Sequence, residues 1–222
     1  MTEQDYLGPT RHVESDAPQV VEFARAAAAG AAEDVERAVR IYSAVRDRIV
    51  YDPYDRFDDD SSFSALRALQ RGRGFCIPKA ALLVACARAS GIPGRLGFAD
   101  VRNHLASRRL TVANNGDIFR WHCFAELLLG GRWVKATPAF DLALCERAGI
   151  VPLEFDGGSD SVFHAFDRSN RKHMEYVLER GSFAGVPVEA ILETWRKHSP
   201  GFFDASYLRG GRAFADEMEA PR

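Results

Sequence analysis

The chain has 222 residues, of which 46% are hydrophobic, 27% charged and 11% aromatic, and its formal net charge at pH 7 is -2. This composition is typical of a globular protein and provides no basic surface for nucleic acid. A chain of this length can bury about 70% of its unfolded surface, so it needs no disulfide or metal to fold. It has no apolar run of roughly eighteen residues and no basic start followed by an apolar core. We therefore expect a cytoplasmic protein without a membrane partner.

Helical periodicity dominates the first part of the chain. Apolar residues recur at helical intervals over residues 17–29 and again over residues 31–50, which predicts two helices. The Asp-rich segment YDPYDRFDDDSSF that follows is typical of a loop. Ser62 or Ser64 can then cap a short helix that runs to Leu69, because a hydroxyl accepts the free N–H groups of a first helical turn.

A second apolar run lies in RGRGFCIPKAALLVACARASGIPGR, residues 71–95, and stops at Gly91. This pattern predicts a helix that begins at Cys76. The next segment, residues 95–101, is short and apolar and predicts a strand. Residues 102–117 are polar, contain ANNGD and are typical of a surface loop.

The strongest local signal is the segment FRWHCFAELLLGGRWVKATPAF, in which two apolar stretches are joined by Gly130 and Gly131. Two glycines between alternating strands predict a two-residue hairpin turn. With these as turn residues, opposed positions sum to 261, which predicts three pairs that can be checked: Leu129 with Arg132, Glu126 with Lys135, and His122 with Ala139.

Alternation along this hairpin places His122 on the less apolar of its two faces. The other face is wholly apolar and is expected on the core: Cys123, Ala125, Leu127, Leu129, Val134, Ala136, Pro138 and Phe140. Thr137 and Asp141 are the diagonal neighbours of His122, so either side chain can hold the orientation of the imidazole.

After the hairpin, the segment PLEFDG predicts a strand and residues 188–198 predict a helix. No internal repeat or low-complexity linker divides the chain. We therefore expect a single domain over residues 1–222, with a core over about residues 40–141 and a C-terminal extension over residues 142–222.

Cys76 has the local setting of a nucleophile. A cysteine at a helix start meets unpaired backbone N–H groups and the positive end of the helix dipole, which favour thiolate over thiol. Pro78 is tolerated in the first helical turn. A buried packing role is the alternative for Cys76, and it is the role expected for Cys86, Cys123 and Cys145.

Spacing gives no support for a metal or disulfide scaffold. The four cysteines lack the spacing of a zinc knuckle, and Cys76 and Cys86 would lie about 15 Å apart along one helix. The acidic and histidine residues of the C-terminal half match no known ligand pattern: His164, His173, Asp156 and Asp160. We expect no metal and no cofactor.

The combination of GRGFCIPKAALLVACARASGIPGRLGF with HCFAELLLGGRWVKATPAFD resembles the core of the transglutaminase-like superfamily of bacterial cysteine enzymes. In that family G-x-C opens a helix that ends in GIPAR, and H-x-W-x-E-x-x-x-x-G-x-W-x-x-x-D-P forms the histidine hairpin. The resemblance covers residues 40–141. It implies an α+β fold of the papain/transglutaminase-like type, in which a cysteine-bearing helix packs on an antiparallel β-sheet behind N-terminal helices.

The resemblance implies that Cys76 is the nucleophile and His122 the base. The aspartate of the family's triad falls at Thr137, which carries no negative charge, and Asp141 on the same face is the alternative third residue. Gln70 lies six residues before Cys76, where papain-like proteases keep an oxyanion donor. His104 is an alternative base if its loop folds over the cleft.

This resemblance implies acyl transfer on an amide or ester through a thioester at the cysteine. Hydrolysis would make the protein a peptidase or amidase, and transfer to an amine would make it a transamidase; the substrate would be a peptide, a protein or a small amide. Two alternatives remain open. One is an arylamine N-acetyltransferase, which RGRGFC partly resembles, and the other is a non-catalytic binding module, which Thr137 favours.

Overall fold

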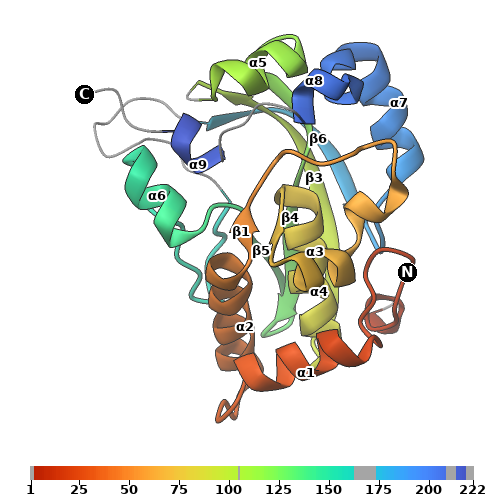
Figure 1. Ribbon diagram of the computed structural model, residues 1–222. Coiled ribbons are helices and arrows are strands. Elements are labelled where there is room, and N and C mark those ends of the chain that lie inside the picture. Colours follow the sequence, from red (N-terminus) through yellow and green to blue (C-terminus); the bar gives the residue numbers. More distant parts are fainter. Residues whose placement is uncertain (1–2, 105, 163–173, 209–213, 219–222) are drawn as a thin grey trace.

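The computed structural model describes residues 3–104, 106–162, 174–208 and 214–218 (Figure 1). Its main sheet has four antiparallel strands in the order β5-β4-β3-β6, where β3 is Gly94–Asn103, β4 is Ile118–Leu129, β5 is Arg132–Ala136 and β6 is Met174–Phe183. A second, two-stranded parallel sheet joins β1 (Val50–Tyr51) to β2 (Arg73–Gly74). This mixed helix and sheet architecture is the expected α+β class.

The helices form an N-terminal group, which includes α4, and a later group in the upper half of the view (Figure 1). The N-terminal group is α1 (Pro18–Ala27), α2 (Asp34–Arg48), α3 (Ala65–Arg71) and α4 (Cys76–Ala89). The later group is α5 (Arg108–Asn114), α6 (Leu142–Ala148), α7 (Val188–His198), α8 (Ala205–Leu208) and α9 (Phe214–Glu217). Three short 3-10 turns complete the described part: η1 (Glu3–Tyr6), η2 (Asp60–Phe63) and η3 (Pro200–Phe203).

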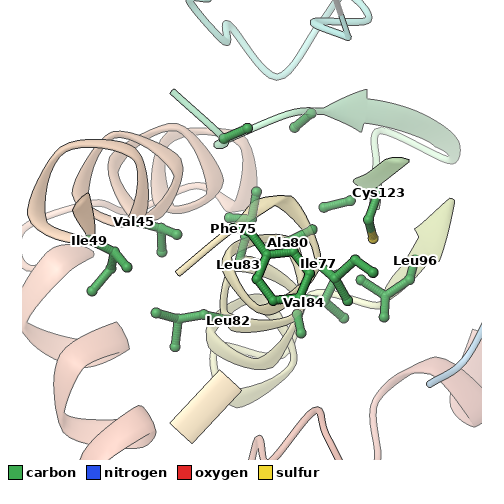
Figure 2. Close-up of a cluster of buried hydrophobic side chains, with 14 of the residues drawn as sticks. Val45, Ile49, Phe75, Ile77, Ala80, Leu82, Leu83, Val84, Leu96 and Cys123 are labelled. Atoms are coloured by element: carbon green, nitrogen blue, oxygen red, sulfur yellow. The ribbon is translucent and has the colours of Figure 1, made fainter. Parts of the chain in front are cut away.

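Helix α4 is the centre of the core. All twelve residues from Ile77 to Arg88 are buried, because α1, α2 and α3 pack against it and β3 and β4 cover its other side. Figure 2 shows α4 with Val45 of α2 and Ile49, which follows α2, on one side and Leu96 and Cys123 of the sheet on the other. A helix that is apolar all round is expected where it is enclosed on every side.

Two buried cations fix α4 at both ends. Lys79 is fully buried, and its Nζ donates to the carbonyl oxygen of Arg46, at 3.0 Å, and to that of Ile49, at the C-terminal end of α2. Arg88 donates to the carbonyl of Gly94, where β3 begins, and to the carbonyls of Gly8 and Ala184. Burial lowers the pKa of Lys79 to about 7, so near neutral pH this amine is about half uncharged. A neutral amine still has the two N–H groups that the two carbonyls require.

The hairpin has the predicted register. Leu129 pairs with Arg132 and Glu126 pairs with Lys135, and both turn glycines have positive φ, as a type I′ turn requires. The apolar face is buried as expected. The ladder ends at Ala136, however, so the predicted pair of His122 with Ala139 does not form. The cause is local: Pro138 has no N–H, and the N–H of Thr137 donates to the carbonyl of Ser161.

The helix predictions hold for residues 17–29, 31–50 and 188–198, and Ser64 caps α3 by accepting from the N–H of Arg67. Two predictions are wrong. Residues 102–117 contain α5, whose cap is Ser107 and whose apolar side is buried. The segment PLEFDG is irregular, because side chains of α2, not a neighbouring strand, bind the carbonyl of Leu153.

Among the described residues, no helix has the combined length and apolar character needed to cross a bilayer.

Candidate active site

Cys76 is the first residue of α4, and the segment before it is held by the small parallel sheet. Gly74 of β2 accepts a hydrogen bond from the N–H of Asp52, and a side chain at Gly74 would meet the ring of Pro78 at 3.1 Å. The chain therefore turns directly from β2 into the first turn of α4. This turn leaves the Cys76 side chain half-buried, facing β4.

Opposing influences act on the Cys76 thiol. Burial is the largest and raises its pKa to about 11, whereas hydrogen bonds from the backbone N–H groups of Cys123, Ile77 and Cys76 itself lower it. The expectation from the helix start alone, a depressed pKa, is therefore reversed, because enclosure outweighs the N–H groups. The influence of the Cys123 N–H places the sulfur near β4, at the residue that follows His122.

His122 sits on β4 directly after a β-bulge. Ala99 of β3 pairs with His122 and Val101 pairs with Phe119, so Asp100 alone opposes both Arg120 and Trp121. One extra residue on one strand bends it and changes the direction of the next side chain. Trp121 takes up this change with φ of +64°, a conformation that an aromatic residue rarely adopts. The strained position lies next to the candidate base.

Asp100 holds this bulge. Its Oδ1 accepts from the N–H of Trp121 at 3.1 Å, and its carboxylate pairs with Arg180 at 2.5 and 2.8 Å. The guanidinium of Arg180 in turn lies 4.6 Å from the centre of the Trp121 ring. Helix α7 adds two bonds: the Trp121 indole donates to Thr194, and the Trp195 indole donates to the carbonyl of Arg120.

Cys76 and His122 line one cavity of about 80 Å³. Its walls are largely aromatic: the described lining residues include Tyr51, Phe57, Phe75, Phe119, Trp121, Phe140, Trp195, Phe202, Tyr207 and Phe214. The N-terminal part of the chain, β4 and the C-terminal segment all contribute. A reactive group at Cys76 would therefore lie in a largely aromatic cavity.

The two candidate third residues are used in other bonds. The hydroxyl of Thr137 donates to the carbonyl of Val162 at 3.3 Å. Asp141 caps α6 by accepting from the N–H of Leu144, and its other oxygen accepts from the N–H of Tyr51, both at 2.9 Å. Both residues are buried, and neither belongs to the described lining of the cavity.

The other candidate residues do not belong to the described lining of the cavity. Gln70 is exposed on α3, and His104 is exposed after β3, where it is 3.5 Å from Glu175. Trp133, on β5, packs on Tyr6 and beneath Arg95 and does not belong to the described lining of the cavity.

The remaining cysteines and the acidic and histidine residues of the C-terminal half add no metal site in the described chain. Cys86, Cys123 and Cys145 are buried free thiols. Asp156 closes a turn by accepting from the N–H of Gly158, and Asp160 accepts from that of Lys135. His164 and His173, which sequence spacing set aside as ligands, lie outside the described residues. The described residues contain no group of three or more potential metal ligands.

Sequence reasoning missed two parts of the site. The bulge at Trp121 has no sequence signature, although an acidic residue such as Asp100 within an apolar strand is a signal for a buried partner. The second part is the aromatic wall formed by Trp195, Phe202 and Tyr207, which reach the cavity from more than a hundred residues beyond Cys76. Only tertiary structure brings them there.

Comparisons with known proteins identify one family model and two solved structures that are similar to the chain. The model of the transglutaminase-like superfamily matches residues 21–138. No curated protein is significantly similar to the chain in sequence. Among solved structures, a "putative cysteine protease" from Cytophaga hutchinsonii superposes with a TM-score of 0.47 at 18% identity, over 80% of this chain and 53% of its own. A "putative protease" from Parabacteroides distasonis superposes with a TM-score of 0.39 at 15% identity, over 60% of this chain and 25% of its own. The chain thus spans about half the length of the first of these proteins and a quarter of the length of the second.

Proposed function

The chain belongs to the transglutaminase-like superfamily, and we propose that it is a cysteine-dependent acyl-transfer enzyme that acts on an amide or ester. One observation carries the proposal: Cys76, at the start of α4, and His122, on β4, line the same cavity. The sulfur lies against the N–H of Cys123, the residue after His122. A thiol and an imidazole brought together in this way are the groups that thiol acyl transfer requires.

In the proposed reaction, the imidazole of His122 takes the proton from the Cys76 thiol as the sulfur attacks the carbonyl carbon of the substrate. Backbone N–H groups at the start of α4 stabilise the negative charge that develops on the carbonyl oxygen. The tetrahedral intermediate collapses to a thioester, and His122 returns the proton to the leaving amine or alcohol. Water then attacks the thioester, which releases the acid and restores the thiol. An amine in place of water would give the transamidase reaction.

Asp141 enters this proposal as a positioning residue. Its carboxylate joins the N–H of Tyr51 on β1 to the start of α6, and Tyr51 lines the cavity. Thr137 stays the position that matches the aspartate of the family, and its hydroxyl is bonded to Val162. Because both bonds of Asp141 are to backbone N–H groups, its effect on the reaction is expected through the shape of the cavity.

The test is acylation by p-nitrophenyl acetate, followed by the burst of p-nitrophenolate and by the mass of the peptide that contains Cys76. The wild-type chain should gain one acetyl group at Cys76. Cys76→Ser and His122→Ala should lose the burst, whereas Cys145→Ser and His104→Ala should retain it. Loss of the burst in His104→Ala, with retention in His122→Ala, would reverse the assignment of the base.

Two further outcomes would contradict the proposal. If Cys76 is not acetylated by the ester while iodoacetamide still alkylates it, the thiol is accessible and the chain is a non-catalytic binding module. If acetyl-CoA acetylates Cys76 and the acetyl group passes to an arylamine faster than to water, the protein is an arylamine acetyltransferase. Analysis of the product formed with water and with glycine amide separates hydrolysis from transamidation.

A further inference from the structure

The wall of the cavity opposite α4 and β4 is built by the C-terminal part of the chain. Trp195 of α7, Phe202 of η3, Tyr207 of α8 and Phe214 of α9 all line it and are all at most 8% exposed. The match to the superfamily ends at residue 138, before any of them. The wall therefore lies outside the part of the chain that the family model matches.

This wall is packed ring against ring onto the N-terminal part of the chain. Phe202 lies 5.6 Å from Phe57, 5.5 Å from Trp195 and 5.4 Å from Tyr207, measured between ring centres. Phe57 also lies 5.2 Å from Phe75, the residue before the candidate nucleophile. Edge-to-face contacts of this kind stabilise a fixed arrangement of rings. The width of the cavity is thus set by these side chains.

Polar bonds at the rim hold the wall in place. The Tyr207 hydroxyl donates to the carbonyl of Pro53 at 2.8 Å. Glu217 accepts from Ser107 and from Arg109, each at 3.0 Å, and also from the Tyr54 hydroxyl. These partners come from the chain before α4 and from around α5, so the rim is tied on two sides.

We infer that the C-terminal segment forms an acyl pocket beside Cys76, selective for a compact, uncharged acyl group. This inference rests on the proposed function. The size follows from the volume: about 80 Å³ is roughly half of a 150 Å³ cavity that accepts benzene, so a short acyl group fits and a long chain does not. The absence of charge follows from the aromatic wall, where an unpaired carboxylate would lose its hydration. Arg120 borders the cavity, but its guanidinium is directed to the carbonyl of Ile118 at 3.5 Å.

The test compares p-nitrophenyl acetate, butyrate, octanoate and monosuccinate as acyl donors to Cys76. We expect acetate and butyrate to acylate the wild-type chain at least tenfold faster than octanoate or monosuccinate, because one or two misplaced groups in a pocket change rates by this factor. Phe202→Ala should raise the octanoate-to-acetate ratio about tenfold. Phe203→Ala is the matched control, since Phe203 is the next residue and lies under Arg196, outside the described cavity lining.

Alkylation of Cys76 by iodoacetamide and by iodoacetate provides a second readout that needs no turnover. Relative to free N-acetylcysteine, the neutral reagent should be favoured about tenfold over its anionic analogue. If Phe202→Ala does not fold, Phe202→Leu should give a smaller shift in the same direction. Equal rates for octanoate and acetate in the wild-type chain, or an unchanged ratio in a folded Phe202 variant, would overturn the pocket. Failure of every ester, with the alkylation preference retained, would overturn the proposed function and leave the pocket standing.

Discussion

The bulge before His122 gives the sharpest prediction about how the fold positions the candidate base. Trp121 has φ of +64°, which costs an ordinary residue about 1–2 kcal/mol. Asp100 offsets this cost by accepting from the Trp121 N–H and by pairing with Arg180. Asp100→Asn keeps a side-chain oxygen for the N–H but removes the charge that holds Arg180. We therefore expect the bulge to loosen while the sheet stays folded.

The magnitude follows from the burial of the pair. The Asp100 side chain is 7% exposed and that of Arg180 is 20% exposed, so Asp100→Ala, which breaks the pair outright, should lower the free energy of unfolding by about 3 kcal/mol. A shift of about 1 Å in a reacting group can reduce a rate by about a hundredfold. For the milder Asp100→Asn we expect about a tenfold loss in the acylation rate of Cys76. Asp117→Asn, which removes an exposed partner of Arg102, should change neither quantity.

Trp121→Gly separates positioning from general destabilisation. Glycine adopts positive φ without strain, so the bulge should persist in this variant without help from Asp100. The Trp121 ring also lines the cavity, so rates are compared within each background and never across them. Asp100→Asn should reduce acylation about tenfold with Trp121 present and no more than about twofold with Gly at position 121. An equal loss in both backgrounds would refute the positioning role.

Three further predictions test the packing of α4, the packing of the sheet and the bonds that hold α9 at the rim of the cavity. Burial lowers the pKa of Lys79 from its ordinary value of 10.5 to about 7 in the folded chain. Burial of this side chain therefore destabilises the fold most below pH 7, where the amine is charged. The free energy of unfolding should rise as the pH increases from 7 towards 10.5, because the unfolded chain then binds more protons than the folded chain. Chemical denaturation should therefore show the stability of the wild-type chain rising relative to Lys79→Met by about 1 kcal/mol per pH unit between pH 7.5 and 9; a constant difference would contradict a buried amine that titrates. Gly97→Ala should destabilise by about 1–3 kcal/mol in the same assay, because its Cβ would lie 2.1 Å from the ring of Phe124; no change would mean that this ring is free to move. Glu217→Gln weakens the bonds that tie α9 to the rim and should speed iodoacetamide alkylation of Cys76 several-fold, whereas an unchanged rate would show that those bonds do not limit access.

The parts of the fold that follow from sequence are those fixed by local chemistry. The helix from Cys76 follows from a continuous apolar run and the register of the hairpin from a glycine pair, and both are where they were predicted. Strand β6 and helix α5 were missed because their conformations depend on partners distant in the chain. Helix α5 is polar in sequence but buries Leu110 and Ala113. Strand β6 is largely exposed and forms by pairing with β3.

The same distinction applies within the candidate site. The resemblance to the family, rather than local context alone, singles out Cys76 and His122 as the candidate pair. It does not separate Thr137 from Asp141, since that choice depends on where the chain turns after β5. The ladder stops one residue before Thr137, and Asp141 becomes the cap of α6. A pattern of alternating faces can be extended only as far as the hydrogen bonds of the strand continue.

Burial of the Cys76 thiol in the cavity affects both its protonation and the proposed acyl-transfer reaction. In the proposed reaction the proton leaves the Cys76 thiol as the sulfur attacks, and an adjacent base accepts it, because burial raises the pKa of this thiol to about 11. His122 lines the same cavity and is the described group placed to accept it. The enclosure that raises the pKa also strengthens the hydrogen bonds of backbone N–H groups to a developing oxyanion, because little water competes for them. In the proposed reaction, a cavity walled by Trp195, Phe202 and Tyr207 makes the resting thiol less reactive and favours attack on an acyl group that fits beside it.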